Sequence, residues 1–118
     1  MSAKVLLAAV ALTILGAAPA SAAYAIAFNP SSGHAAANNA SWDLDQVKRA
    51  ALSSCGRGCR IVASGKRSCS AVVESISTGT NAWAVANGTT ASTATNSAWH
   101  GCRQKGGVNC KTAAAICD

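Results

Sequence analysis

Large apolar side chains are scarce in this 118-residue chain. From Ala23 onward, leucine, isoleucine, valine and phenylalanine together number only 13. That share, roughly 14%, is below the ~20% under which a chain has difficulty building a hydrophobic core. Much of the remaining apolar content is alanine, which buries little surface. A folded domain with this sequence therefore needs stabilisation from something besides its core.

Acidic residues are also scarce, with four against ten lysines and arginines. Asp43 and Asp45 fall where a helix is expected to begin, and Asp118 ends the chain. A glycosidase needs two carboxylates that face one bond, and Glu74 with Asp43 is only a formal candidate for such a pair. The excess of positive charge favours contact with anionic partners such as nucleic acid, anionic lipid or acidic glycans.

Catalytic and cofactor-binding motifs are missing too. The chain has no Gly-x-Ser-x-Gly elbow, phosphate-binding loop or dinucleotide glycine pattern. His34 and His100 would each need a neighbouring nucleophile to act as a base, and we interpret both as surface residues. We expect no enzyme activity, no cofactor and no metal site. A small secreted hydrolase is the alternative.

The first 22 residues have the composition of an export signal. Lys4 supplies a positive start, residues 5–15 form an uncharged apolar run, and Ala20, Ser21 and Ala22 resemble a cleavage site. A glycine and a proline interrupt the run before it reaches the roughly 20 residues of a membrane-spanning helix. We expect cleavage after Ala22, no membrane anchor after processing, and a secreted protein, either periplasmic or extracellular.

Six cysteines follow the predicted cleavage point: Cys55, Cys59, Cys69, Cys102, Cys110 and Cys117. An even number of cysteines in an exported domain indicates disulfides, here three. Zinc is the alternative, but only Cys55 and Cys59 have the spacing of a ligand pair. A disulfide that closes a loop as long as 69–117 stabilises a fold by about 4 kcal/mol.

One pattern occurs twice, in residues 25–69 and 71–117 of a single domain that spans 23–118. Segment 25–28 aligns with 71–74, Ser32-Gly33 with Thr78-Gly79, and Asn38 with Asn87. The cysteines align in order: Cys55 with Cys102, Cys59 with Cys110, and Cys69 with Cys117. Two copies are too few for a solenoid. We predict a small α+β domain of two pseudo-symmetric strand–strand–helix–strand units, whose helices pack on an antiparallel or mixed sheet.

Local patterns predict the elements of each unit. In the first unit, alternation predicts a strand at 24–28, and turn residues at 29–33 separate it from a weak strand at 35–38. Ser41 is the predicted cap of a helix that ends at Gly56, and a strand follows at 59–63. The inner face of that helix is Leu44, Val47, Ala51 and Cys55.

The second unit follows the same plan. Strands are predicted at 69–76, 82–86 and 110–117, with a turn at 77–79. Thr89 or Thr90 caps a helix that ends at Gly106-Gly107, and its predicted inner face is Ala91, Ala94, Ala98 and Cys102. Alanine on the inner helix faces lets both helices lie close to a sheet.

Pseudo-symmetry narrows the fifteen possible pairings of six cysteines. Each cysteine at a helix end could join the start of the next strand, as Cys55–Cys59 and Cys102–Cys110. Cys69 and Cys117, which we interpret as equivalent unit ends, would then pair with each other. A disulfide between the helices, Cys55–Cys102, is the main rival.

Several motifs together resemble a known family. They are segments 25–28 (AIAF), 31–33 (SSG), 50–55 (AALSSC) and 59–62 (CRIV), followed by Trp83, 102–107 (CRQKGG) and Cys110-Lys111. This combination resembles the bacterial domain-of-unknown-function 4189 family over nearly the whole chain after the signal. The resemblance implies a small exported bacterial domain without an assigned activity, and it transfers no catalytic residue. Residues 35–37 are alanines where the family tends to have aromatics, and the second helix is unusually rich in serine and threonine.

The remaining candidate site is basic. If the two units pack about a pseudo-twofold axis, seven cations could form one basic edge: Arg57, Arg60, Lys66, Arg67, Arg103, Lys105 and Lys111. Neutralisation of helix C-terminal dipoles is the alternative role for these residues. We interpret Trp42, Trp83 and Trp99 as the bulky part of the core, with exposed anchors as the alternative.

These observations favour a secreted, non-enzymatic binding or effector-like domain with a basic surface. Its partner would be a protein or an anionic component of the envelope, a glycan or a nucleic acid. An inhibitor or protective partner of another secreted protein is the first alternative, because rigid disulfide-linked domains lose little entropy on binding. The secreted hydrolase is the second.

Overall fold

The computed structural model describes residues 22–76 and 81–118. The predicted signal (except Ala22) and the predicted turn at 77–79 lie outside the described residues. The elements, in order, are β1 (Ala23–Phe28), β2 (Ala35–Asn38), α2 (Leu44–Cys55), β3 (Arg60–Lys66), β4 (Cys69–Ser75), β5 (Ala82–Gly88), α3 (Ala91–Gln104) and β6 (Lys111–Cys117).

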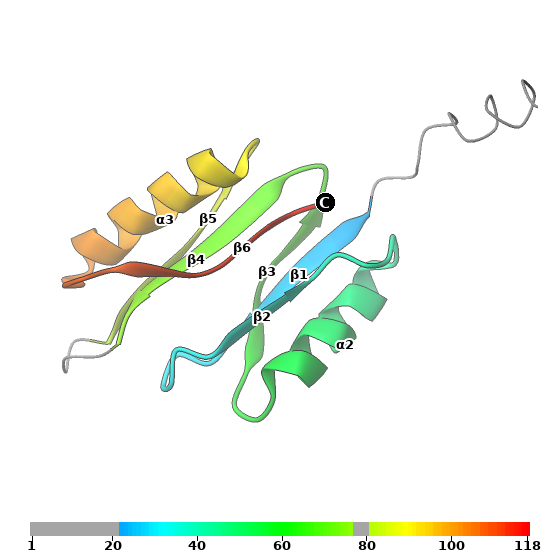
Figure 1. Ribbon diagram of the computed structural model, residues 1–118, viewed down its shortest axis with the longest axis horizontal. Helices are drawn as coiled ribbons and strands as arrows, with labels where there is room; N and C mark the ends of the chain where they lie inside the picture. Colours follow the sequence, from blue (N-terminus) through cyan, green and yellow to red (C-terminus); the bar gives the residue numbers. More distant parts are fainter. Residues whose placement is uncertain (1–21, 77–80) are drawn as a thin grey trace, which may run out of the picture.

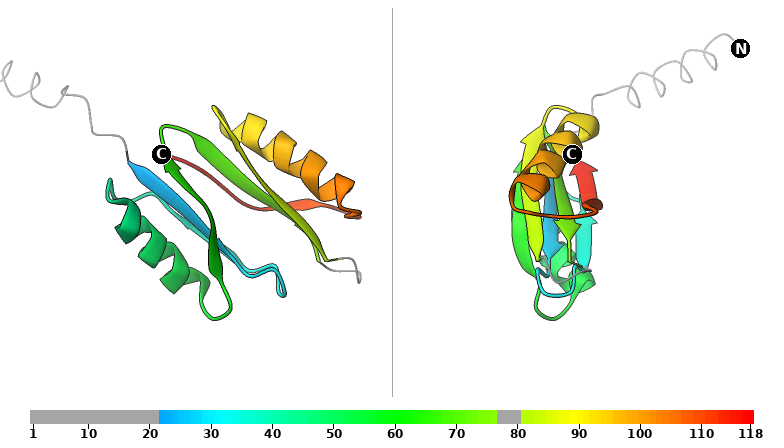
Figure 2. Two further views of the ribbon diagram at one scale, coloured as in Figure 1. Left: turned by 180° about the vertical axis from the view of Figure 1, so that it is seen from behind. Right: turned by 90° about the vertical axis from the view of Figure 1, so that its left-hand side faces the viewer.

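The domain is a sandwich of four layers (Figure 1). The first unit forms the antiparallel sheet β2-β1-β3, and the second forms the antiparallel sheet β5-β4-β6. The sheets pack face to face, while α2 and α3 cover their outer faces (Figures 1 and 2). The α+β prediction with two strand–strand–helix–strand units is confirmed, and each unit has its own antiparallel sheet.

Side-chain size separates the layers of the sandwich. Along β1, the alanines at 23, 25 and 27 pack against α2, whereas Ile26 and Phe28 face the second sheet. The same alternation on β4 directs Ala71 and Val73 toward α3, and directs Val72 toward the first sheet. The few large side chains are therefore concentrated between the two sheets, and alanine fills the spaces between helices and sheets.

The close approach of helix to sheet is clearest at α3. A Cβ atom on Gly101 would lie 2.7 Å from the Cβ of Ala84 on β5. The helix buries Ala94, Ala98 and Cys102, as predicted, whereas Ala91 is exposed. Ala91 is the first residue of the helix, three residues after the end of β5.

The helix caps agree with the sequence at α3 and differ at α2. Thr90 caps α3, and its side chain accepts a hydrogen bond from the Thr93 N–H. At α2 the predicted cap, Ser41, is wrong, because Asp43 accepts hydrogen bonds from the first N–H groups of the helix. Ser41 instead accepts from the Asp43 N–H and shapes the preceding turn. Both residue types favour the cap position, so composition alone could not choose between them.

Three disulfides link the chain: Cys55–Cys59, Cys69–Cys117 and Cys102–Cys110. The first and third join the end of a helix to the start of the next strand. Cys69 and Cys117, however, are not equivalent unit ends. Cys69 is the first residue of β4, and it pairs with Cys117 on β6 as Ala23 pairs with Lys66 in the first unit. This disulfide therefore cross-links neighbouring strands within the second sheet.

The strand register shows that the predicted alignment of Asn38 with Asn87 between the two units is wrong by one residue. Ala25 pairs with Asn38, and its counterpart Ala71 pairs with Ala86. Asn38 therefore corresponds to Ala86, and the neighbouring Asn39 corresponds to Asn87. The two adjacent asparagines made the sequence alignment ambiguous by one residue.

Both sheets have a β-bulge at the same place. The β1–β3 pairing skips Val62 opposite the step from Ile26 to Ala27. The β4–β6 pairing skips Ala113 opposite the step from Val72 to Val73. A bulge adds twist to an antiparallel pair, so the two sheets twist at equivalent points.

Candidate functional site

Trp83 is the centre of a cluster at one end of the sandwich. Its ring lies on the inner face of β5, half-buried, with its centroid 5.1 Å from that of Phe28. The Arg60 guanidinium lies 5.5 Å from the indole centroid, and the Lys105 ammonium lies 5.6 Å from it. Lys105 also donates a hydrogen bond of 3.0 Å to the Trp83 carbonyl. One indole therefore orders two cations.

Strand register explains how these residues meet. Arg60 begins β3 and pairs with Phe28, the last residue of β1. Trp83 pairs with Glu74 on β4, and Lys105 follows the last turn of α3. The cluster thus combines residues from both units, at the end where β3, β5 and β6 begin.

Glu74 is the acidic residue of this cluster, and it is paired. It pairs in register with Lys111 on β6, and the Lys111 Nζ lies 3.5 Å from its carboxylate. Glu74 is only 3% exposed, whereas the side chain of Lys111 is 73% exposed. Gly33, at a φ of +80°, lies so close that an added Cβ would be 3.0 Å from the carboxylate. The positive charge therefore faces solvent, and the negative charge is buried.

Arg57 lies at the same end. Its carbonyl accepts a hydrogen bond from the Asn29 amide, which holds the turn after α2 against the loop after β1. We call the group Arg57, Arg60, Trp83, Lys105 and Lys111 the Trp83 end.

The expectation of one basic edge is wrong for the remaining cations. Lys66 ends β3 and Arg67 follows it, so both lie at the opposite end of the sandwich from Arg60. A strand of this length separates its two ends by roughly 20 Å. Arg103 lies on the exposed side of α3 beside Trp99. Arg60 and Lys66 are close in sequence, but they lie at opposite ends of β3, so the length of the strand separates them.

A groove runs along one side of the sandwich, between the edge strands β3 and β5. Its volume is about 450 Å³, and its lining residues are Ile61, Val62, Ala63, Ser64, Val85, Ala86 and Asn87. Val62 and Val85 belong to the core between the sheets but are only half-buried. On the other side, β2 lies close to β6. We call the first feature the β3–β5 groove; β3 and β5 lie on the near side in the rear view of Figure 2.

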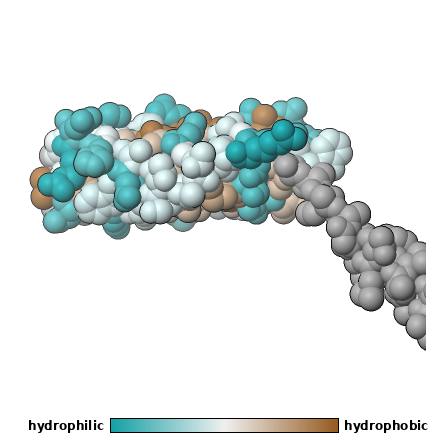
Figure 3. Space-filling model, turned by 90° about the horizontal axis from the view of Figure 1, so that it is seen from above, coloured by the Kyte–Doolittle hydropathy of each residue, from teal (hydrophilic) through white to brown (hydrophobic). Residues whose placement is uncertain are grey.

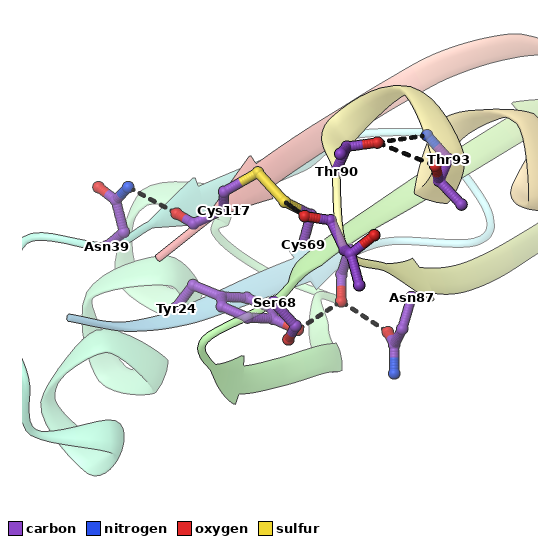
Figure 4. The surroundings of a disulfide bond; sticks show 10 residues. Tyr24, Asn39, Ser68, Cys69, Asn87, Thr90, Thr93 and Cys117 are labelled. Atoms are coloured by element: carbon purple, nitrogen blue, oxygen red, sulfur yellow. Dashed lines mark hydrogen bonds between the residues drawn. A yellow bond between two sulfur atoms is a disulfide. The ribbon is translucent and has the colours of Figure 1, made fainter. Parts of the chain in front are cut away.

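A buried polar network closes the sandwich at the end opposite Trp83 (Figure 4). The Tyr24 hydroxyl lies 2.7 Å from Ser70 Oγ and 3.0 Å from Ser68 Oγ. Ser70 in turn donates a hydrogen bond of 2.6 Å to Oδ1 of the Asn87 side chain. Among the described residues, no buried side-chain nitrogen or oxygen lacks a hydrogen-bond partner.

Two of the three tryptophans are not part of the core. Trp42 is 69% exposed and Trp99 is 37% exposed, so the expectation of three core tryptophans is wrong. Alanine fills the helix–sheet spaces, which leaves room for an indole only between the sheets. Trp99 and Arg103 border two shallow cavities of about 370 and 350 Å³ on α3. Figure 3, a view from above Figure 1, shows hydrophilic and intermediate residues with scattered hydrophobic patches.

A family model described as "Domain of unknown function (DUF4189)" matches residues 23–117. The chain belongs to this family. The DUF4189 match begins at the first residue of β1 and ends at the last residue of β6, so it includes both units. No curated protein and no solved structure shows significant similarity to the chain.

The two carboxylates considered as a glycosidase pair lie far apart in the described part of this DUF4189 domain. Asp43 caps α2 beside the start of β1, whereas Glu74 lies at the opposite end of the sandwich. His34 and His100 are both exposed. Among residues 22–76 and 81–118, no three His, Cys, Asp or Glu side chains gather where they could hold a metal ion. None of the helices described is long and apolar enough to cross a membrane.

Proposed function

We propose that this chain is exported, that it loses residues 1–22, and that its DUF4189 domain is a non-enzymatic binding domain for an anionic partner. The Trp83 end is the proposed contact surface. The observation that carries this proposal is the placement of the Arg60 and Lys105 cations on the Trp83 ring.

Pre-ordered cations suit the recognition of anions. A cation–π contact at an exposed site contributes roughly 0.5–1 kcal/mol and restricts a long side chain to few rotamers. A side chain that is already ordered loses less entropy when a partner binds. Lys111 and Arg57 add positive charge nearby, and the nearest carboxylate, Glu74, is buried.

Export is supported by the signal-like N-terminus and the three disulfides. Disulfides form and persist in oxidising compartments. Without them, the small core would leave the domain weakly stable. Mass spectrometry of the exported protein tests both points. We expect a chain that begins at Ala23, with a mass six hydrogens below that of its fully reduced form.

Retention of the processed protein on immobilised heparin, measured at low and high salt, tests the binding proposal. We expect salt-sensitive retention and an affinity about tenfold lower when Arg60→Gln and Lys105→Gln are combined. The matched control combines Lys48→Gln with Arg49→Gln, which removes the same charge from α2. Equal losses in both variants would reduce the proposal to a non-specific effect of net charge. Turnover of a cell-wall or nucleic-acid substrate that disappears in Glu74→Gln or His100→Ala would contradict the non-enzymatic part.

A further inference from the structure

We infer that the β3–β5 groove binds an extended segment of a protein partner, which adds as a strand to the free edge of β3 and carries acidic residues on both sides of an uncharged stretch. The inference rests on the proposed function for its choice of an anionic partner. It goes further by naming a protein segment, a binding mode and a second surface.

The first support is topology. β3 is an edge strand of the first sheet and β5 is an edge strand of the second, and both lie on the same side of the sandwich (Figure 2). An edge strand has outward backbone N–H and C=O groups that no neighbouring strand pairs. An extended peptide can pair with such groups and extend the sheet.

The second support is the floor of the groove. Val62 and Val85 face each other's sheet and remain half-buried, within a groove of about 450 Å³. Every second side chain of an added strand would point toward this floor. Small apolar side chains on the peptide would therefore cover the exposed part of the intersheet core.

The third support is the distribution of charge along β3. Arg57 and Arg60 lie at its start, and Lys66 and Arg67 lie at its end. Residues 61–65 between them carry no charge, and none of the described residues that line the groove is acidic. Charges within an edge strand discourage pairing, whereas here the central edge is free of them. The pattern is complementary to a segment with acids about six residues apart.

A synthetic peptide with two aspartates, five alternating valines and threonines, and two more aspartates is the probe. Amide hydrogen exchange of the processed protein would report where it binds. We expect the peptide to slow exchange within residues 61–65 and not in β2, the edge strand on the other side. Two versions of the peptide with N-methylated backbones are the matched controls, one for each edge of the peptide. Methylation of the paired edge removes at least two backbone hydrogen bonds, which should weaken binding about tenfold or more, and methylation of the other edge should not.

The charge pattern has its own test. Combining Lys66→Gln with Arg67→Gln should weaken peptide binding about threefold to tenfold, and high salt should remove the difference. Heparin retention should depend mainly on Arg60 and Lys105. If the peptide leaves exchange in residues 61–65 unchanged, or if both methylated peptides bind as well as the parent, the strand-addition inference fails and the heparin result stands. If the peptide protects β3 from exchange, but the combined Arg60→Gln and Lys105→Gln variant is retained on heparin as well as its control, only the proposed function fails.

Discussion

The two sides of the sandwich differ although the two units have the same element order. On one side β2 lies close to β6, and the side chains there are mostly alanines, including Ala35, Ala113 and Ala114. On the other side Trp83 and Val85 of β5 face Val62 of β3, and a groove remains. In a fold with pseudo-twofold symmetry about the strand direction, these sides would be equivalent if the units were identical. Side-chain size at a few inner positions is therefore sufficient to close one side and leave the other open.

Cross-linking follows the same asymmetry. Cys69–Cys117 links β6, on the closed side, to the centre of its sheet. At the equivalent place on the open side, Ala23 pairs with Lys66 and no covalent link is possible. The strand that we infer to accept a partner is thus the one that has no disulfide to the central strand of its sheet.

Removing the Cys69–Cys117 disulfide should change the stability of the closed side more than any other variant proposed here. The double variant Cys69→Ala, Cys117→Ala releases a loop with a sequence separation of 48, which should lower the free energy of unfolding by about 4 kcal/mol. Chemical denaturation measures the loss, and hydrogen exchange in β6 should rise toward that in β3. The control, Cys55→Ala with Cys59→Ala, opens a loop with a separation of only 4, so its loss should be smaller. Equal losses would show that chain entropy is not the cause.

Equivalent alanines on the two sides provide a matched test of packing. Ala63 pairs with Ile26 on the open side, and Ala114 pairs with Val72 on the closed side. Ala114→Leu should destabilise the domain by about 1–3 kcal/mol, because a closed interface cannot accommodate the added carbons. Ala63→Leu should change stability by less than about 0.5 kcal/mol, because its side chain can extend into the groove. Thermal or chemical denaturation of both variants decides the point, and similar costs would mean that the groove is not open in solution.

The smallest expected effect concerns two equivalent cations. Arg60 pairs with Phe28 and contacts Trp83, whereas Lys111 pairs with Glu74. Because the Lys111 side chain is well exposed and glutamine still offers an N–H donor to the buried Glu74 carboxylate, Lys111→Gln should cost less than about 1 kcal/mol. Arg60→Gln should cost a similarly small amount of stability but weaken heparin retention more than Lys111→Gln does, since Arg60 is ordered by the ring. If Lys111→Gln lost more heparin retention than Arg60→Gln, the binding surface would instead lie nearer β6, on the closed side.

Much of the local structure could be predicted from sequence because it depends on short-range patterns. The spacing of Val47, Ala51 and Cys55 predicts the buried face of α2. The alternation in 24–28 predicts which side chains share a face, but the half-buried strand that it indicates is wrong, because α2 covers one face of β1 and the second sheet covers the other. Gly56 at the end of α2, with a φ of 93°, is a second example.

The arrangement of the site could not be predicted in the same way, because it depends on which strands pair. The sequence did not reveal that each unit forms its own sheet, or that β3 separates Lys66 from Arg60 by its own length. The contact of Trp83 with cations from both units also required the packing of one sheet on the other. Alanine-rich strands give weak signals for such contacts, because many pairings would bury them equally well.

The single extra residue at each bulge determines which side chains reach the middle of the sandwich. Side chains of a strand change face at every step, so Val62 reverses the orientation of everything before it in β3. If Val62 instead took a regular place in the ladder, Arg60 would face α2 and the indole would lack its guanidinium. Ala113 does the same for Lys111 and the Glu74 carboxylate. Both units thus contain one extra residue in their last strand, and this residue sets which side chains of the strand face the other sheet. The contacts of Arg60 and Lys111 at the Trp83 end depend on it.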